Sequence, residues 1–315
     1  MSAKNIHTLL ITGSTGLVGS RFVELFKKDF SIVTIGRSNV DNQIDLTSKE
    51  EVFRTIQSSD ADVLINFAAY TNVDEAEKEK GDTKGEVYTI NTLLPFWLAK
   101  SCQDSGKKLY HISTDYVFDG KQEDRPYTEK DTPSPVDSWY SITKYKGEIG
   151  VANGFKKQEN FSIIRISYPY SGVYKRKLDF ARAIIERLSK KEPYLGIIDQ
   201  KIKPTSVDDI ANALQFLIFK QATGIYHVAG NYFPEKYITP LQFAKKIAKE
   251  MNMDTSLIKP ISFRQLSKKR ISPRPQHTWL STEKIESLGF HITPIDEVLK
   301  RFKNQILNSE STIIK

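Results

Sequence analysis

The chain of 315 residues contains one cysteine, Cys102, and no apolar run long enough to cross a bilayer. A single cysteine excludes an intrachain disulfide and a cysteine metal cluster, and we expect Cys102 to be a small buried helix residue. The N-terminal residues lack the long apolar stretch of a secretory signal. These absences predict a protein of a reducing, cytoplasmic compartment that makes no membrane contact.

Nucleic-acid-binding motifs are also absent, although the formal net charge is +8. Residues 1–150 carry 18 Lys and Arg against 23 Asp and Glu, a net charge of −5, whereas residues 151–315 carry 28 against 15, a net charge of +13. Excess positive charge attracts either nucleic acid or a phosphorylated small molecule. Without a recognition motif, we expect a phosphorylated metabolite and no nucleic acid, and we interpret basic stretches such as Lys268-Lys269-Arg270 as solvated surface.

Short apolar runs alternate with helical patterns in the first half of the chain. Continuous apolar strands alternating with helices predict a parallel sheet covered on both faces. Strands are expected at residues 8–11, 31–35, 63–67, 109–112 and 161–166. Helices are expected at residues 17–30, 49–57 and 84–103, where Pro95 should bend or break the last one, and around residues 140–144.

The pattern becomes irregular after residue 167. Helices are expected near residues 178–190, 207–220, 241–251, 282–288 and 295–307, with a short strand at residues 224–228. The predicted fold is α/β: a Rossmann-type doubly wound parallel sheet with a smaller C-terminal lobe. This lobe should lie over the carboxyl ends of the strands, where open α/β sheets bind ligands.

A glycine-rich turn follows the first strand and opens the first helix. Gly13 allows a sharp turn, Gly16 lets backbone N–H groups approach a pyrophosphate, and Gly19 lets the helix pack close to the sheet. The strand–turn–helix context predicts dinucleotide binding by the whole run, which is Gly13, Ser14, Thr15, Gly16, Leu17, Val18 and Gly19. No Lys-Ser or Lys-Thr pair follows the last glycine, which argues against a P-loop kinase or ATPase.

The second strand ends in Gly36-Arg37-Ser38, without the acidic residue that would bind a ribose 2′-hydroxyl. Arg37 can neutralise a 2′-phosphate, so we predict NADPH, with NADH possible; an ordinary exposed arginine is the alternative. Further cofactor contacts are predicted from Asp45, Leu46, Ala68, Ala69 and Tyr70. Residues 1–166 are therefore predicted to be an NADP-binding domain, and residues 167–315 mainly a substrate-binding lobe with some segments that return to the first domain.

A tyrosine and a lysine four positions apart, Tyr140 and Lys144, follow a hydroxyl residue, Thr114, at a predicted strand end. Residues four apart lie on one helix face. An ammonium beside a phenol favours the phenolate and should lower the pKa of the phenol toward neutrality. Such a pair is suited to proton transfer in reducing a carbonyl or oxidising an alcohol.

Several longer motifs occur in order along the chain. They are Asn66-Phe67-Ala68-Ala69-Tyr70-Thr71-Asn72-Val73-Asp74, Ser113-Thr114-Asp115-Tyr116-Val117-Phe118-Asp119-Gly120, the Tyr140-to-Lys144 segment, Asp199-Gln200-Lys201-Ile202-Lys203-Pro204-Thr205, and Arg274-Pro275 followed by Leu280. Together they resemble the dTDP-4-dehydrorhamnose reductase family of extended short-chain dehydrogenases/reductases, over nearly the whole chain.

The resemblance implies catalytic roles for Thr114, Tyr140 and Lys144. Thr114 would hydrogen-bond the reacting oxygen, and Tyr140 would donate a proton to it as hydride arrives. Lys144 would hold the nicotinamide ribose and depress the pKa of the tyrosine, so both Tyr140 and Lys144 would also contact the cofactor. Substrate contacts are implied for Thr71, Thr114, Tyr168, Thr205 and Arg274.

Two segments depart from the family pattern: the one after the fifth predicted strand and the position directly after Tyr140. Tyr168 replaces the usual Trp after the fifth strand, and the basic residues Lys175-Arg176-Lys177 replace small polar ones nearby. Ser141 replaces the usual Gly after Tyr140, a change that a helix should tolerate. The first departure concerns the segment that contacts the sugar, so it bears on which sugar is the substrate.

The predicted function is NADPH-dependent reduction of a nucleotide-linked 4-keto-6-deoxy sugar. One alternative is a related epimerase or dehydratase that recycles tightly held NAD. Another is a cofactor-binding regulatory subunit like that of methionine adenosyltransferase. The candidate partners are the nucleotide-diphosphate sugar and a second copy of the chain in a homodimer. No metal site is predicted within the chain, although exposed carboxylates could bridge subunits through Mg²⁺.

Overall fold

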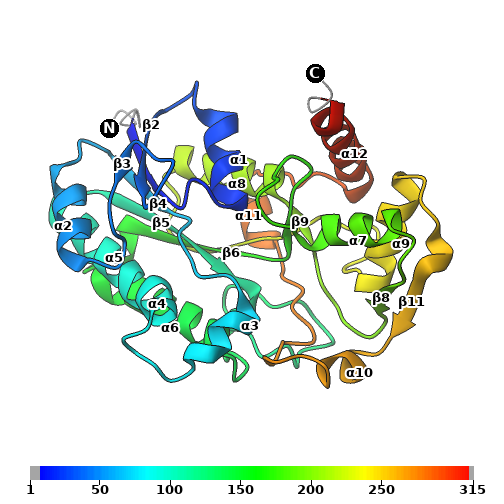
Figure 1. Cartoon of the computed structure of the whole chain (residues 1–315). Coiled ribbons are helices and arrows are strands. Elements are labelled where there is room, and N and C mark those ends of the chain that lie inside the picture. The colour runs from blue at the N-terminus through cyan, green and yellow to red at the C-terminus, as the bar shows by residue number, and fades with distance from the viewer. Residues whose placement is uncertain (1–7, 312–315) are drawn as a thin grey trace.

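The computed structural model describes residues 8–311, apart from the side chains of residue 158 and residues 309–311. At its centre is a seven-stranded parallel sheet with the order β10-β6-β5-β4-β1-β2-β3 (Figure 1). Its strands are β1 (Thr8–Thr12), β2 (Ser31–Gly36), β3 (Asn42–Gln43), β4 (Val63–Asn66), β5 (Lys108–Thr114), β6 (Phe161–Ile166) and β10 (Gly224–Val228). The order reverses between β1 and β4, and such a switch point is where doubly wound sheets bind ligands.

Helices cover both faces of the sheet. Helices α1 (Leu17–Phe26) and α8 (Val207–Phe219) cover one face, and α2 (Lys49–Ser58), α5 (Leu94–Ser105) and α6 (Trp139–Gly154) cover the other. Leu9 and Ile11 of β1 pack into the first core, whereas Leu10 between them packs into the second. Side chains of a strand alternate between the faces, so two buried faces require the continuous apolar runs seen in the sequence.

The smaller part of the molecule has its own core and lies to the right in Figure 1. It comprises β7 (Pro169–Tyr170), α7 (Phe180–Ser189), β8 (Tyr194–Ile197), β9 (Thr205–Ser206), α9 (Pro240–Glu250), β11 (Ile258–Ile261), α10 (Phe263–Ser267) and α12 (Ile295–Ser311). Tyr170, Phe243 and Phe302 meet in this core with ring centroids 5.4 Å apart. The four strands of this smaller part form two separate two-stranded sheets, β11-β8 and β7-β9. Neither sheet was predicted from the sequence.

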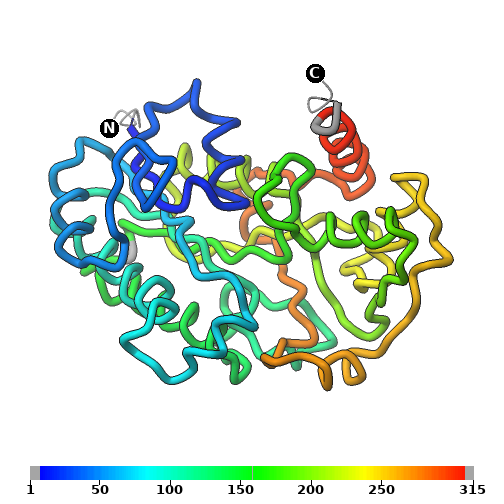
Figure 2. The backbone as a smooth tube through the Cα atoms, viewed as in Figure 1, coloured from blue at the N-terminus to red at the C-terminus, as the bar shows by residue number. Residues whose placement is uncertain are grey.

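The chain crosses between the two parts more than once (Figure 2). After α7 and β8 the chain returns to the larger part, where α8 packs on one face of the large sheet and β10 forms its edge strand. Later, α11 (Glu283–Ser287) packs on β10. The predicted fold class, a Rossmann-type doubly wound parallel sheet with a smaller C-terminal lobe, is therefore confirmed. The division at residues 166 and 167 stays a prediction.

Two helices of the structure differ from the sequence prediction in where they end or how they divide. Helix α1 stops at Phe26 because Lys27-Lys28-Asp29 form a turn that returns Phe30 to the core. The helix predicted over residues 84–103 is divided into α4 (Glu86–Tyr88), a π-helical turn η2 (Thr89–Leu93) and α5. Pro95 lies in the first turn of α5, where its missing N–H removes no helical hydrogen bond, so the helix is interrupted just before it.

Within residues 8–311, no helix combines the length and apolar composition needed to span a bilayer. Cys102 is fully buried in α5, as predicted, and burial raises the pKa of its thiol to about 12. A thiol with so high a pKa carries no thiolate nucleophile at neutral pH. The cytoplasmic compartment stays a prediction.

Candidate active site

The glycine turn is closely packed. Gly13 has a φ of +66°, and a Cβ there would stand 2.5 Å from the backbone N of Ala68. A Cβ on Gly19 would stand 2.3 Å from the carbonyl oxygen of Gly13. Gly13 therefore provides the predicted sharp turn and brings it against the end of β4, while Gly19 lets α1 approach the turn itself instead of the sheet.

The same turn leaves polar groups for an anionic ligand. Gly16 is the N-cap residue of α1 and has no side chain to accept from the first N–H groups of the helix. The hydroxyl oxygen of Ser14 is buried and has no hydrogen-bond partner among the described residues. Free N–H groups at a helix start bind phosphate well, so these residues fit the pyrophosphate of a dinucleotide.

An open pocket of about 450 Å³ lies at the end of β2, lined by Arg37, Gln43, Ile44, Asp45 and Glu51. Arg37 is half-exposed, and it forms an ion pair with Glu86. Asp45 accepts hydrogen bonds from the N–H and hydroxyl of Thr47, and these hold the pKa of its carboxyl below the usual value. Leu46 differs from its neighbour, because it lies in the core and does not line the pocket.

A buried polar network beside the glycine turn joins the ends of β1 and β4 to the middle of β5. The Thr12 hydroxyl donates to Asn66 Oδ1 at 2.6 Å, and Asn66 Nδ2 lies 2.9 Å from His111 Nδ1. The N–H of Ala68 also donates to Asn66 Oδ1. This network holds the loop of Ala68 and Ala69 at the switch point, but the sequence analysis gave Asn66 and His111 no role.

Asn91 is a second residue without a predicted role. It lies in the π-helical turn η2, where it accepts from the N–H of Tyr70 at 2.9 Å and donates to the carbonyl of Tyr70 at 3.1 Å. It also donates to the Thr143 hydroxyl on α6. π-Helical turns are frequent at functional sites, and this one ties the loop after β4 to the helix that carries Tyr140. A polar residue close before Pro95 was the available signal.

Thr114, Tyr140 and Lys144 come together at the carboxyl end of β5. The Thr114 hydroxyl lies close enough to the Tyr140 phenol to lower the pKa of that phenol. The ammonium of Lys144 is buried and donates to the carbonyl of Ile112 at 2.9 Å. Ser138 caps α6 by accepting from the N–H of Ser141, so the serine in place of glycine fits the first helical turn.

The predicted lowering of the tyrosine pKa by Lys144 is wrong for this structure. Burial raises the pKa of Tyr140 well above its usual value, and the nearby Thr114 hydroxyl only partly opposes this. Burial also lowers the pKa of Lys144 to about 8, against the attraction of Glu148. The cost of desolvating a phenolate dominates, so Tyr140 keeps its proton at neutral pH.

Asp115 lies directly behind the hydroxyl pair. Its carboxylate accepts from Thr114 at 3.1 Å and from Ser167 at 3.0 Å. Burial raises the pKa of Asp115 to about 6, although these hydrogen bonds lower it. Asp115 therefore fixes the orientation of the Thr114 hydroxyl.

Aromatic rings continue the site toward the smaller part. Tyr116 stands edge-on to both Tyr140 and Tyr168, with centroids 5.8 and 6.3 Å away. The hydroxyl of Tyr168 accepts from Gln200 at 3.1 Å. Tyr168 has a φ of +42°, a conformation that costs a non-glycine residue energy and directs its ring toward Tyr116.

The other predicted substrate residues lie in different surroundings. Thr71 is exposed in the loop after β4. Arg274 donates to Asp74 Oδ1 at 2.9 Å, and its charge reaches Tyr116 and Tyr140. Thr205 is fully buried in the β7-β9 pair and donates to the carbonyl of Lys203, so it presents no surface to a ligand.

No group of three or more His, Cys, Asp or Glu side chains that could hold a metal ion occurs within the described part of the chain. The predicted homodimer, and a Mg²⁺ ion bridging its subunits, stay predictions.

Similar proteins share both the sequence and the fold. The dTDP-4-dehydrorhamnose reductase of Mycobacterium tuberculosis is 30% identical over 295 residues, which cover 91% of this chain and 88% of that protein. A crystal structure of dTDP-4-dehydrorhamnose reductase from Bacillus anthracis in complex with NADP is 30% identical, with a TM-score of 0.81 over 94% of this chain and 98% of that one. A UDP-glucose 4-epimerase from Thermotoga maritima is 15% identical, with a TM-score of 0.78 over 98% of this chain and 100% of that one. This is a similarity of fold alone.

The family model described as the RmlD substrate binding domain matches residues 7–308. A match over nearly the whole chain, together with a 30% identical relative spanning nine-tenths of it, confirms the family predicted from the sequence. The chain belongs to the RmlD family of dTDP-4-dehydrorhamnose reductases.

Proposed function

We propose that this chain is an NADPH-dependent reductase of a nucleotide-linked 4-keto-6-deoxy sugar. The observation that carries the proposal is the buried hydroxyl pair of Thr114 and Tyr140 beside Lys144, at the carboxyl end of β5. The relatives named dTDP-4-dehydrorhamnose reductase support the class of substrate. Residues 1–166 would bind the cofactor, and residues 167–315 would mainly bind the sugar nucleotide.

Each part of the cofactor has residues that would hold it. The Gly13–Gly19 turn would bind the pyrophosphate, and Arg37 would contact the 2′-phosphate at the pocket that it shares with Asp45. Lys144 would hold the nicotinamide ribose through its ammonium. When bound there, NADPH supplies the hydride.

Tyr140 would act as the general acid. A carbonyl oxygen that receives electrons needs a proton donor within hydrogen-bond reach. Because burial raises its pKa, Tyr140 carries its proton at neutral pH and can release it to the strongly basic alkoxide. In this structure Thr114 donates its single hydroxyl proton to Asp115. When the substrate binds, that hydroxyl would turn to donate a second hydrogen bond to the same oxygen.

The direct test is to incubate the protein with dTDP-4-keto-rhamnose and NADPH and follow the absorbance of the reduced cofactor. Stoichiometric oxidation of NADPH with formation of the dTDP-deoxy-sugar is expected. Turnover without net cofactor consumption would instead indicate an epimerase or dehydratase. No turnover with any nucleotide 4-keto sugar, together with co-purification of a catalytic partner, would indicate a regulatory subunit.

A further inference from the structure

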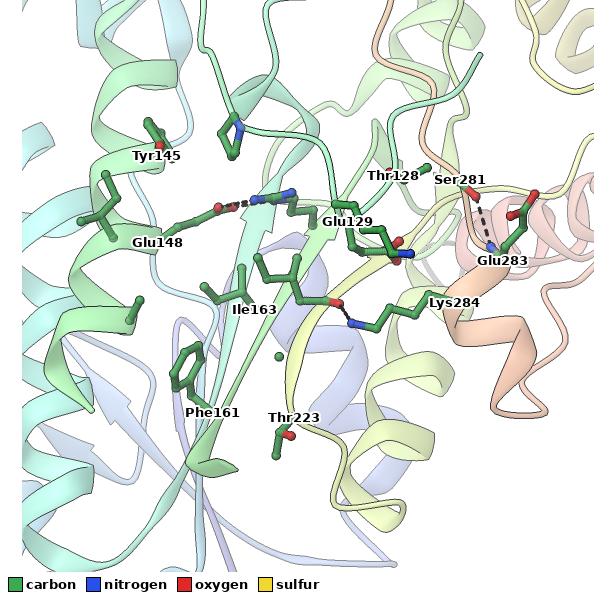
Figure 3. Close-up of a pocket in the computed structure, with 17 residues that line it drawn as sticks. Thr128, Glu129, Tyr145, Glu148, Phe161, Ile163, Thr223, Ser281, Glu283 and Lys284 are labelled. Carbon is green, nitrogen blue, oxygen red and sulfur yellow. Dashed lines mark hydrogen bonds and ion pairs between the residues drawn. The ribbon is translucent and has the colours of Figure 1, made fainter. Parts of the chain in front are cut away.

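A second pocket, of about 860 Å³, is drawn in Figure 3. It shares no lining residue with the glycine turn or with the Arg37 pocket. Its walls come from α6, β6, β10, the loop at residues 128–133, Ser281 and the start of α11. None of the residues predicted to bind the cofactor or the sugar lines it. Its lining does include Glu148 and Arg165, an ion pair that the proposed reaction does not use.

The Glu148–Arg165 pair is held rigidly. Glu148 projects from α6 toward the sheet (Figure 3), where its two oxygens accept from Nε and one terminal nitrogen of Arg165 at 2.9 and 2.7 Å. The side chains are 4% and 1% exposed. The guanidinium also lies over the ring of Phe118, 5.1 Å from its centroid. Two parallel charge-assisted hydrogen bonds fix both the distance and the plane of the carboxylate.

Glu148 stands one helical turn after Lys144 on the same face of α6. Lys144 is 2% exposed, and its ammonium donates to Ile112 of β5. On the neighbouring strand β6, Arg165 is paired in register with Ser113, next to Ile112. The pair therefore braces α6 against β6, the neighbour of the strand β5 to which the Lys144 ammonium is hydrogen-bonded.

The charges around Lys144 leave Glu148 as its main counter-charge. On β5, His111 is buried, and both burial and Lys144 hold its pKa well below the usual value, so it is neutral. On α6, Tyr140 keeps its proton. Arg165 faces Glu148 from β6, with His227 of β10 and the loop residue Glu129 beyond it. Among the described neighbours, Glu148 is the one charge found to favour the protonated form of Lys144.

We propose that the Glu148–Arg165 pair is a positioning element that keeps Lys144 an ammonium, fixed beside the tyrosine that acts as proton donor. This inference rests on the proposed function, because it assumes that the charge of Lys144 is used in the reaction. An uncharged lysine could not attract the developing alkoxide or hold the ribose through three donors. Burial alone favours the neutral amine, so a fixed carboxylate one turn away opposes that tendency.

The test is the variant Glu148→Gln, with two measurements. First, the alkaline limb of the pH profile of kcat/KM is recorded with the keto sugar and NADPH. Loss of the carboxylate should move this limb toward acid by about 1–3 pH units, the usual effect of one nearby opposite charge. Second, the Lys144 ammonium is titrated by ¹⁵N NMR, with Lys144→Arg to assign its signal. This titration should move in the same direction, and it needs no turnover.

Control variants separate this role from simple stabilisation. Asp208→Asn breaks another buried ion pair, with Arg21, and should reduce stability without moving either titration. The double variant Glu148→Leu/Arg165→Met removes both charges and restores packing, so it should stay folded and still shift both titrations. Glu148→Asp keeps the charge and should recover part of the shift.

An unchanged Lys144 titration in Glu148→Gln would overturn the proposal. A shifted titration with an unmoved alkaline limb would also overturn it, because the charge would then not serve the reaction. If the unaltered protein reduces no nucleotide keto sugar, the proposed function fails, and the NMR titration by itself decides whether the pair sets the charge of Lys144.

Discussion

The two ends of the proposed cofactor site differ in almost every physical respect. At the Tyr140 end the polar groups are buried, hydrogen-bonded to one another and shifted in pKa by desolvation. At the Arg37 end the charged side chains are exposed, and their partners are other surface residues. Electrostatic interactions are stronger where water is excluded, so the first end is suited to chemistry and the second to recognition.

This difference sets the size of the effect expected from a mutation. A change at the buried end removes an interaction that water cannot replace, whereas water and mobile ions compensate for much of a change at the exposed end.

Tyr140→Phe should have the largest effect. It removes the proposed general acid, so turnover should fall by about 10²–10⁴-fold, while NADPH affinity should change little. Steady-state kinetics and fluorescence titration of the cofactor measure the two quantities. Tyr110→Phe is the matched control, because Tyr110 is buried on β5 and donates to the Leu217 carbonyl. It should cost about 1 kcal/mol of stability and leave turnover unaltered. A comparable loss of turnover in both variants would contradict the role of Tyr140.

Gly13→Ala should follow. The new side chain must adopt a left-handed backbone conformation, which should cost about 1–2 kcal/mol of stability. It also meets the backbone of Ala68, which should cost about 1–3 kcal/mol more. Because the turn then moves, NADPH affinity should drop by roughly tenfold or more. Gly106→Ala is the control, because Gly106 has a φ of +69° and open space around it. Chemical unfolding should show the smaller penalty there, and equal penalties would contradict the close approach at Gly13.

Asp115 should make stability depend on pH. Burial raises its pKa from 3.8 to about 6, so the folded chain holds a proton that the unfolded chain releases. This contribution is complete below about pH 4 and is lost as pH rises through 6, a loss of about 2–3 kcal/mol. Urea unfolding of the protein and of Asp115→Asn at pH 4 to 7 should show this dependence only in the former. At the exposed end, Asp45→Asn should remove a weak dependence of opposite sign, because the pKa of Asp45 is lowered.

Arg37→Ala should have the smallest effect. It should reduce the preference for NADPH over NADH by about tenfold or less, since the arginine is half-exposed. The ratio of kcat/KM for the two cofactors measures this preference. Arg54→Ala, an exposed position on α2 outside the pocket, should leave the ratio unchanged. If Arg37→Ala also leaves it unchanged, another residue recognises the 2′-phosphate.

Local patterns in the sequence were enough to predict the sheet, the glycine turn and the family. The glycine spacing, the apolar strands and the Tyr140-to-Lys144 interval depend on residues within one or two elements, so backbone geometry links them directly to structure. The roles of Asn66, His111 and Asn91 were not predicted, because each has hydrogen-bond partners 21–54 residues away.

The sequence alone thus determined which residues carry the proposed chemistry: the hydroxyls of Thr114 and Tyr140, the amine of Lys144 and the glycine-rich turn Gly13–Gly19. Only the tertiary structure decided their ionisation, because burial is a property of the packed chain and not of any motif. The Tyr140–Lys144 spacing predicted a lowered pKa for Tyr140. In the folded chain Tyr140 instead keeps its proton, and Lys144 depends on Glu148 to keep its charge.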